Sequence, residues 1–383
     1  MVRQFLTLSA GEGVARGLHA LAFLALARRF GPAAMGVFGV AQAVASYGML
    51  GVQRGLDVPA MLRVTREPGA AEAVRSAVVR LRAPVFLVLL AGAAIWGNGL
   101  LLAMAGMWLA GALQVRWLLL ARQESAPVAV GALLASAVFF GAAMMGLPLV
   151  WVAAALSAGE LMASGWYWLA AGGPVREGKV LEGDLQREAW PFFGSLLLGN
   201  LLYNLDVFVL GAVRGGTEVG LYVAAFRLLT VFSPVLGALQ NSALPQFGRL
   251  YPDGAAARRL AATVWWTSAS AAMGFAMVLV VGATFLLPLL YGDAFGGAAV
   301  VVRVLALVLP VQVTRMVFRQ PLLAFRGQKA DLRNLAVAVG VNLALDLALA
   351  PAYGGLGCAV STLCAEGCFA LLTWRAWRRI SCA

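Results

Sequence analysis

Apolar runs of roughly 18 to 25 residues recur along the whole chain and alternate with short polar segments. Each run is long enough to cross about 30 Å of hydrocarbon as an α-helix. The pattern predicts an all-α polytopic membrane protein with about twelve transmembrane helices. These predicted spans are centred in 5–27, 35–55, 82–97, 99–120, 127–147, 149–170, 191–212, 219–241, 262–290, 298–320, 332–350 and 356–374.

A long polar stretch, GGPVREGKVLEGDLQREAWP at 172–191, has six predicted spans before it and six after it. It predicts an N-terminal six-helix bundle over 1–171, a cytoplasmic linker over 172–190 and a C-terminal six-helix bundle over 191–383.

One short phrase occurs once in each predicted half. Residues 29–42 read RFGPAAMGVFGVAQ and residues 214–227 read RGGTEVGLYVAAFR. Both phrases have an arginine and a glycine turn, then a glycine with an aromatic residue two positions later. Because both join the first and second span of their half, they predict two parallel, pseudo-symmetric bundles around a central cavity, as in transporters with internal repeats.

The composition agrees with a membrane protein, since 62% of the residues are hydrophobic and only 12% are charged. The net charge of +12 would otherwise suggest nucleic acid as a partner. If the N-terminus is inside, however, 21 cations fall on inner segments and three on outer ones. This asymmetry places both termini in the cytoplasm and makes the phospholipid bilayer, rather than nucleic acid, the partner of the basic charge.

Five arginines fall inside predicted spans, where a lipid-facing charge costs about 2.5–3.5 kcal/mol on insertion scales. They are Arg16, Arg227, Arg303, Arg315 and Arg319. Arg303 and Arg319 lie near span ends and can reach the interface by snorkelling. Arg16 and Arg227 lie deeper, one in each half, and indicate a wet cavity that offers cations to an anionic substrate.

The first span has a polar face, because Glu12, Arg16 and His19 are spaced i, i+4 and i+7. One interpretation is a Glu12–Arg16 pair that only stabilises its own helix. The other is a cavity wall, with Arg16 binding substrate and Glu12 taking part in ion coupling.

In the seventh span, Tyr203 and Asn204 share a face with Asn200, and Asp206 lies within roughly 60° of Tyr203. Tyr203 and Asn204 are candidate substrate-binding residues. A buried carboxylate such as Asp206 must be paired, protonated or bound to an ion. Two interpretations are therefore open for it: an internal salt bridge, for example to Arg227, or a functional role in binding substrate or a coupling ion such as Na⁺ or H⁺.

The tenth span carries Gln312, Arg315 and Arg319 on one face. Arg315 is a further candidate for binding an anionic substrate. Asn342, Asp346 and Glu366, in the last two spans, are expected mainly as hydrogen-bond partners between helices.

Enzymatic and cofactor motifs are absent from the sequence. There is one histidine, and the chain has no HExxH, GxxxxGK[ST] or GxSxG motif. The four cysteines, Cys358, Cys364, Cys368 and Cys382, match no metal or redox spacing. These absences predict a protein that is not an enzyme or an ATP-driven pump, and that needs no cofactor beyond a coupling ion.

Several phrases, in order, resemble the polysaccharide and O-antigen flippases of the multidrug/oligosaccharidyl-lipid/polysaccharide (MOP) exporter superfamily. They are LALARRFGPAAMGVFGVAQAVASYGMLGVQRGLDVPAMLR, LLLGNLLYNLDVFVLGAVRGGTEVGLYVAAFRL, YGDAFGGAAVVVRVLALVLP, LLAFRGQKADLRN and VNLALDLALAPAYGGLGCAVSTLCAE. The resemblance covers nearly the whole chain.

The resemblance implies two six-helix bundles, alternating access and a cationic cavity for the pyrophosphate of an undecaprenyl-linked saccharide. The family's cavity arginines correspond to Arg16 and Arg227, and its acidic residue of the seventh helix corresponds to Asp206. Many members have Asn where this chain has Asp346.

The sequence thus predicts a bacterial inner-membrane flippase that moves a lipid-linked oligosaccharide to the outer leaflet, with other polysaccharide-assembly membrane proteins as partners. Two rivals stay open. One is an ion-coupled multidrug antiporter of the same superfamily. The other is a membrane-embedded polyprenyl-sugar transferase or polymerase, which would need a catalytic carboxylate in an outer loop, where Glu218 and Asp293 are the candidates.

Overall fold

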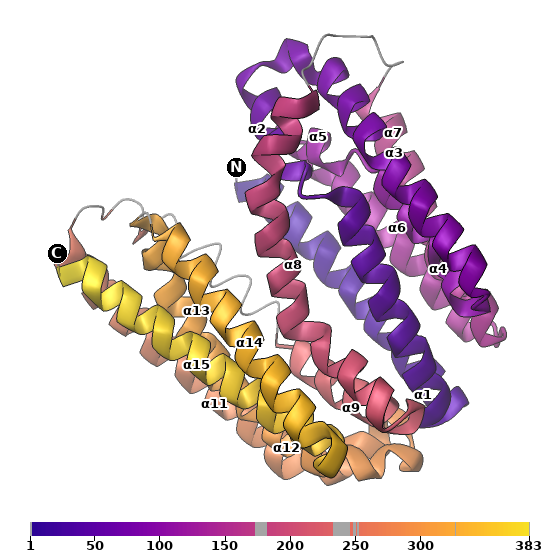
Figure 1. The fold of residues 1–383 in the computed structure, drawn as a ribbon, viewed down its shortest axis with the longest axis vertical. Helices are drawn as coiled ribbons and strands as arrows, with labels where there is room; N and C mark the ends of the chain where they lie inside the picture. The colour runs from indigo at the N-terminus through magenta and orange to yellow at the C-terminus, as the bar shows by residue number, and fades with distance from the viewer. Residues whose placement is uncertain are drawn as a thin grey trace. The chain divides into compact units, whose positions relative to one another are not determined.

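The computed structural model describes residues 2–172, 182–232, 246–247, 250, 253–325 and 327–382. Within these ranges the regular structure is helical (Figure 1), which confirms the predicted all-α class. The longer helices are α1 (Val2–Gln53), α3 (Ala71–Trp96), α4 (Gly99–Leu113), α6 (Ser125–Met144), α7 (Leu149–Ala171), α8 (Glu182–Val213), α9 (Gly216–Thr230), α11 (Gly254–Tyr291), α13 (Val308–Ala324), α14 (Gln328–Tyr353) and α15 (Gly355–Cys382). Shorter helices are α2 (Asp57–Arg66), α5 (Arg116–Ala121) and α12 (Ala299–Ala306), with 3₁₀ turns at Pro68–Ala70 and Asp293–Ala298.

Ten stretches of the described chain are long and apolar enough to cross a membrane, so the protein is a multi-pass membrane protein. The first two predicted spans form the two halves of the single helix α1. The eighth predicted span begins in α9, and its remainder, 233–241, lies outside the described residues. These two differences explain why ten stretches are found where twelve spans were predicted.

Helix α1 is divided at Gly31, whose backbone (φ 72°, ψ 178°) is not helical. Gly215, which precedes α9, has nearly the same conformation (φ 83°, ψ −178°). Side chains disfavour positive φ, so both turns require glycine. Because Gly31 and Gly215 occupy matching places in the repeated phrase, the repeat preserves one backbone turn.

The second glycine of each phrase brings the two copies into contact. A Cβ atom at Gly36 would overlap the backbone carbonyl of Gly216, and one at Gly220 would overlap the carbonyl of Pro32. Both pairs are related by the same offset of 184 residues (216 − 32 and 220 − 36). The contact is therefore reciprocal, with two backbones packed directly because neither glycine has a side chain.

The arginine of each phrase caps a distant loop. Arg29 donates to the carbonyl of Leu147 (3.3 Å), between α6 and α7. Arg214 donates to the carbonyls of Ala350 (3.4 Å) and Ala352 (2.7 Å), where α14 ends. Helix C-termini leave carbonyls without helical partners, so each arginine satisfies such groups in its own half. The repeated phrase thus encodes a turn, a helix crossing and a loop cap.

The chain divides into two compact units, 1–29 with 41–197, and 30–40 with 198–383. They differ from the predicted bundles in dividing α8 and in giving 30–40 to the second unit. Of the predicted linker, 173–181 lie outside the described residues, and 182–190 form the start of α8. The domain boundaries at 171 and 191 stay a prediction.

Buried arginines bind the first unit together. Arg82 has no exposed surface, donates to the carbonyls of Gly111 (3.2 Å) and Gln114 (3.0 Å), and forms an ion pair with Asp57 (2.5 Å). Arg75 is also fully buried and lies 4.6 Å from the ring centroid of Trp168. Both belong to the 21 cations that the sequence places on inner segments, but the fold uses them as internal hydrogen-bond donors.

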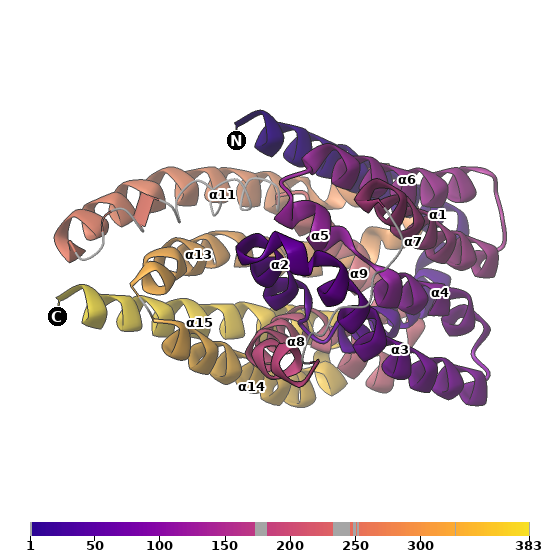
Figure 2. The ribbon, with the colours of Figure 1, turned by 90° about the horizontal axis from the view of Figure 1, so that it is seen from above.

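The second unit contains α11–α15 beside α9 and the end of α8. Figure 2 shows α11, α13 and α15 running alongside one another. Leu202 of α8 packs in one cluster with Leu335 and Ala338 of α14 and Phe369 of α15. Polar side chains interrupt this apolar packing at two places, described next.

Candidate functional site

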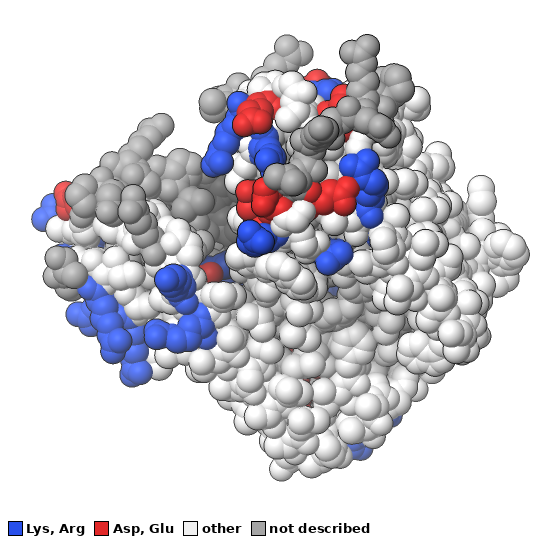
Figure 3. Space-filling model, turned by 45° about the horizontal axis from the view of Figure 1, so that its top comes forward, with Lys and Arg blue, Asp and Glu red and all other residues white. Residues whose placement is uncertain are grey.

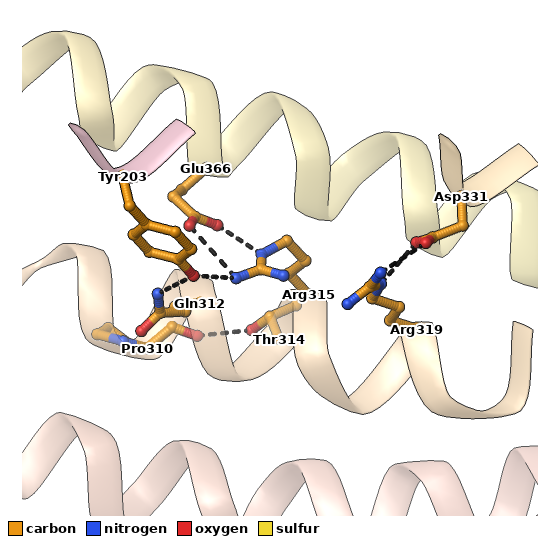
Figure 4. A network of polar contacts seen from close by, with 8 residues as sticks. All are labelled: Tyr203, Pro310, Gln312, Thr314, Arg315, Arg319, Asp331 and Glu366. Carbon is orange, nitrogen blue, oxygen red and sulfur yellow. Dashed lines mark hydrogen bonds and ion pairs between the residues drawn. The ribbon is translucent and has the colours of Figure 1, made fainter. Parts of the chain in front are cut away.

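The first polar group joins α8, α13 and α15 around Arg315 (Figure 4). The Arg315 guanidinium donates to both carboxylate oxygens of Glu366, at 2.6 and 3.3 Å. It also donates to the hydroxyl of Tyr203 (2.9 Å), which accepts a second hydrogen bond from Gln312 (2.9 Å). Arg315 is 4% exposed and Glu366 1% exposed, so a buried ion pair whose two charges cancel lies inside the second unit.

Arg319 lies one turn further along α13 and is paired as well (Figure 4). Its guanidinium donates two hydrogen bonds, each 2.7 Å long, to the carboxylate of Asp331 at the start of α14. This bidentate geometry is the strongest form of the arginine–carboxylate interaction. The predicted single face of α13 exists, but the expectation that Arg319 snorkels is replaced by an ion pair between helices.

The second polar group surrounds Asp206 of α8. Its Oδ2 accepts hydrogen bonds from the hydroxyls of Tyr222 on α9 and Thr362 on α15 (2.7 Å for Thr362). Asp206 is bonded to these hydroxyls and not to Arg227, so the salt bridge suggested between them is wrong.

Asp346 of α14 lies beside Asp206, close to Ser361 and Cys358 of α15. Asp206 and Asp346 are 1% and 0% exposed. Two adjacent buried carboxylates repel each other strongly if both are charged. Either one of them takes up a proton, or a bound cation balances their charge. The pair therefore requires one of these species.

Oxygen atoms are available in this group to hold a cation. The Oδ1 atoms of Asp206 and Asn342 are buried and accept no hydrogen bond from another described residue. Asn342 uses its amide nitrogen to donate to the Ser361 hydroxyl (3.1 Å), which orients the amide. Carboxylate, amide and hydroxyl oxygens are the ligands that hard cations prefer.

In the first unit, Glu12 interacts with two arginines. Its carboxylate forms an ion pair with Arg116 of α5, while Arg16 lies 3.7 Å from the other carboxylate oxygen. The Arg16 side chain is 61% exposed, whereas that of Glu12 is 27% exposed. The Glu12–Arg16 pair exists, but Arg116 is the closer partner, and the Arg16 guanidinium stays accessible.

The other predicted site residues are placed individually. Arg227 lies in the last turn of α9, half-buried, near Tyr291 of α11. Asn204 donates back to the carbonyl of Asn200 within α8 (3.2 Å). Their assignment to substrate binding stays a prediction.

Some participants were missed in the sequence. Tyr222 and Thr362 bind Asp206, yet the spacing of residues on one helix indicates only which face is polar, not which residues of other helices meet it. Arg116 is another of the 21 cations that the sequence places on inner segments. The sequence did offer one signal for this contact, because a carboxylate such as Glu12 inside a span requires a cationic partner.

The described chain is an all-helical, multi-pass membrane protein with paired charges inside its helices. A family model described as "Polysaccharide biosynthesis protein" matches residues 81–251. No curated protein sequence matches the chain.

Solved structures of MOP-type transporters share the fold. A lipid II flippase MurJ in an inward closed conformation has a TM-score of 0.81, is 12% identical, and is aligned over 98% of this chain and 90% of its own. An inward-facing multidrug resistance transporter of the MATE family has a TM-score of 0.76 and 16% identity, over 95% and 94% of the two chains.

A MOP superfamily transporter from Pyrococcus furiosus, reported with a reversed polarity of its binding pocket, has a TM-score of 0.60 and 14% identity, over 99% and 95%. These findings confirm the resemblance to MOP-type transporters read from the sequence, and they establish the fold.

Proposed function

We propose that the protein is a flippase of a bacterial inner membrane that moves an undecaprenyl-pyrophosphate oligosaccharide from the cytoplasmic to the outer leaflet. The observation that carries this proposal is the exposed guanidinium of Arg16 on an apolar helix. Its neighbour Glu12 is engaged by Arg116, so the cation keeps capacity for an anionic ligand. The match to polysaccharide biosynthesis proteins supports a glycan as cargo.

The position of Arg16 suits a phosphate inside the membrane. It lies thirteen residues before Arg29, which is about 20 Å along a helix. Arg227 lies thirteen residues after Arg214. Since both turns are predicted on the outer side, the two cations are expected at similar depth. Arginine can bind phosphate oxygens bidentately, which suits it to carry such a head group.

The flippase proposal predicts that removing these charges slows exchange. The assay uses liposomes that contain a fluorescent undecaprenyl-pyrophosphate oligosaccharide. Arg16→Gln and Arg227→Gln should each lower the rate of leaflet exchange about tenfold or more, because each removes one charge-assisted hydrogen bond to the substrate. Arg333→Gln, which changes a predicted inner-loop cation, should exchange like the wild type.

The same assay separates the rivals. If the wild type moves no glycolipid but expels a cationic dye, the multidrug antiporter takes its place. If it releases a sugar or pyrophosphate product instead, the protein is an enzyme of the transferase class.

We propose further that Asp206 and Asp346 couple transport to Na⁺ or H⁺. The supporting observation is the adjacent buried carboxylates with the free Oδ1 atoms of Asp206 and Asn342. One cation or one proton would compensate the excess negative charge there. The helices α8, α9, α14 and α15 that supply this group would then respond together to its occupancy.

Coupling predicts a stability effect specific to the cation. At a hundredfold excess over its Kd, a bound ion stabilises the folded state by about 2.7 kcal/mol. Replacing choline chloride by NaCl at constant ionic strength should therefore raise Tm for the wild type but not for Asp206→Asn or Asp346→Asn. The exposed Asp293→Asn is the control and should respond like the wild type. A Tm that responds to pH and not to Na⁺ would assign the site to a proton, and no response to either would refute coupling here.

A further inference from the structure

A cavity lies in the second unit, between α11, α13 and α15, and none of the residues that line it belongs to the two polar groups. It has a volume of about 540 Å³ and is lined by Trp265, Val311, Thr314, Phe318, Gly367, Ala370, Leu371 and Trp374. Its one hydroxyl is already satisfied, because Thr314 donates to the carbonyl of Pro310 and accepts from the Trp265 indole, both at 2.8 Å. The wall therefore offers hydrocarbon contacts and suits an apolar chain.

The cavity has the length of part of one leaflet. On α13 it extends from Val311 to Phe318, and on α15 from Gly367 to Trp374. Each stretch covers eight residues, about 10 Å of helix from the first residue to the last, whereas half of the hydrocarbon core is about 15 Å thick. This length fits one acyl chain within a single leaflet better than a long polyprenyl chain.

Basic residues gather at the tryptophan end of the cavity. Arg378 lies over the ring of Trp374, 5.0 Å from its centroid, and Arg375 and Arg379 occupy the same turns of α15. From α11, Arg258 donates to the backbone carbonyl of Ser381, which brings the start of α11 to this end of α15. Figure 3 shows basic side chains gathered at the C-terminal end of α15.

The acidic residue at the start of α11, Asp253, caps its own helix. The carboxylate of Asp253 accepts hydrogen bonds from the backbone amides of Ala255 (3.0 Å) and Ala256 (2.9 Å), and so caps the helix. The rim keeps a positive balance. Tryptophan and arginine together at the end of a span mark the depth of lipid head groups.

We propose that this cavity and its arginines form a binding site for an anionic phospholipid of the surrounding bilayer. One acyl chain lies along Trp265, Leu371 and Trp374, and the phosphate is bound by Arg375 and Arg378. The anionic head group supplies the charge that the rim lacks, and basic pockets between helices on the inner side favour such lipids. The site is independent of the transported cargo, so it extends beyond the proposed function.

Native mass spectrometry of the purified full chain tests the site, with phosphatidylglycerol and phosphatidylethanolamine of identical acyl chains added in equal amounts. The wild type should retain phosphatidylglycerol preferentially. Arg375→Gln and Arg378→Gln should each weaken the retention of phosphatidylglycerol about fivefold. This is the change in affinity expected from the loss of one cation near an anionic head group.

A glycine substitution tests the apolar part. Gly367 lines the cavity, and a Cβ there would meet no atom within 4 Å, so Gly367→Leu should fill the space without disturbing the fold. It should abolish preferential retention. Gly340→Leu on α14, with equally open surroundings, and Arg333→Gln are the matched controls and should retain lipid like the wild type.

Three results would overturn the proposal. The wild type could show no preference for phosphatidylglycerol, or Gly367→Leu could retain it unchanged. In the third, undecaprenyl phosphate displaces phosphatidylglycerol from the wild type at equal concentration, which would assign the cavity to a polyprenyl chain instead.

Discussion

Replacing Gly220 with leucine is expected to abolish recovery of folded protein. A Cβ atom alone would overlap the carbonyl of Pro32, so a larger side chain must force the two helices apart. Overpacking a close contact typically costs about 1–3 kcal/mol, and here the neighbour is backbone, which cannot change rotamer. Gly36→Leu should do the same, because Gly36 faces the carbonyl of Gly216 reciprocally.

The effect should increase with side-chain size. Folded yield by size-exclusion chromatography, and Tm where protein is recovered, should fall in the order Gly220→Ala, Gly220→Val, Gly220→Leu. Gly274→Leu, at an open position on α11, should behave like the wild type. Normal Tm and yield for Gly220→Val would show that the crossing of the repeated phrases is not a close contact in the protein.

Breaking the Arg315–Glu366 pair is expected to cost about 3–5 kcal/mol of unfolding free energy, because removal of one partner leaves an uncompensated buried charge. Arg315→Met should strand the Glu366 carboxylate, and Glu366→Gln should strand the guanidinium. Both should lower stability in denaturant titrations, where the free energy of unfolding is measured.

The double variant identifies the role of the pair. Arg315→Met with Glu366→Gln removes both charges, so its loss of stability should be smaller than the sum of the single losses. A structural pair predicts this recovery. If Arg315→Met instead kept wild-type stability and only lost leaflet exchange, Arg315 would bind substrate, as the sequence had suggested.

The sequence could predict much of the fold, because bilayer thickness and the cost of unpaired backbone groups restrict a chain of this hydropathy to helices of known length. The resemblance of its two halves was visible from Gly36 and Gly220, although its meaning was not. The two glycines lie in one reciprocal helix crossing. Local sequence could not show this, because the crossing forms only when segments 184 residues apart come together in the fold.

The candidate site was predicted only in part. Helical spacing marked Asp206, Arg315 and Glu12 as polar positions in apolar spans, since intramembrane charges are rare and need an explanation. Spacing could not show that Arg315 is paired with Glu366 and bonded to Tyr203, or that Arg116 is a closer partner of Glu12 than Arg16 is.

By itself, then, the sequence determined the helical membrane class, the internal repeat and the faces that carry polar residues, because each depends on local period and composition. Only the tertiary structure decided which polar residues neutralise one another and which stay accessible. The physical reason is that an ion pair in a membrane depends on contacts between helices distant in the chain. Arg16 is exposed, whereas Arg315 is buried and paired with Glu366, although both are arginines in apolar helices.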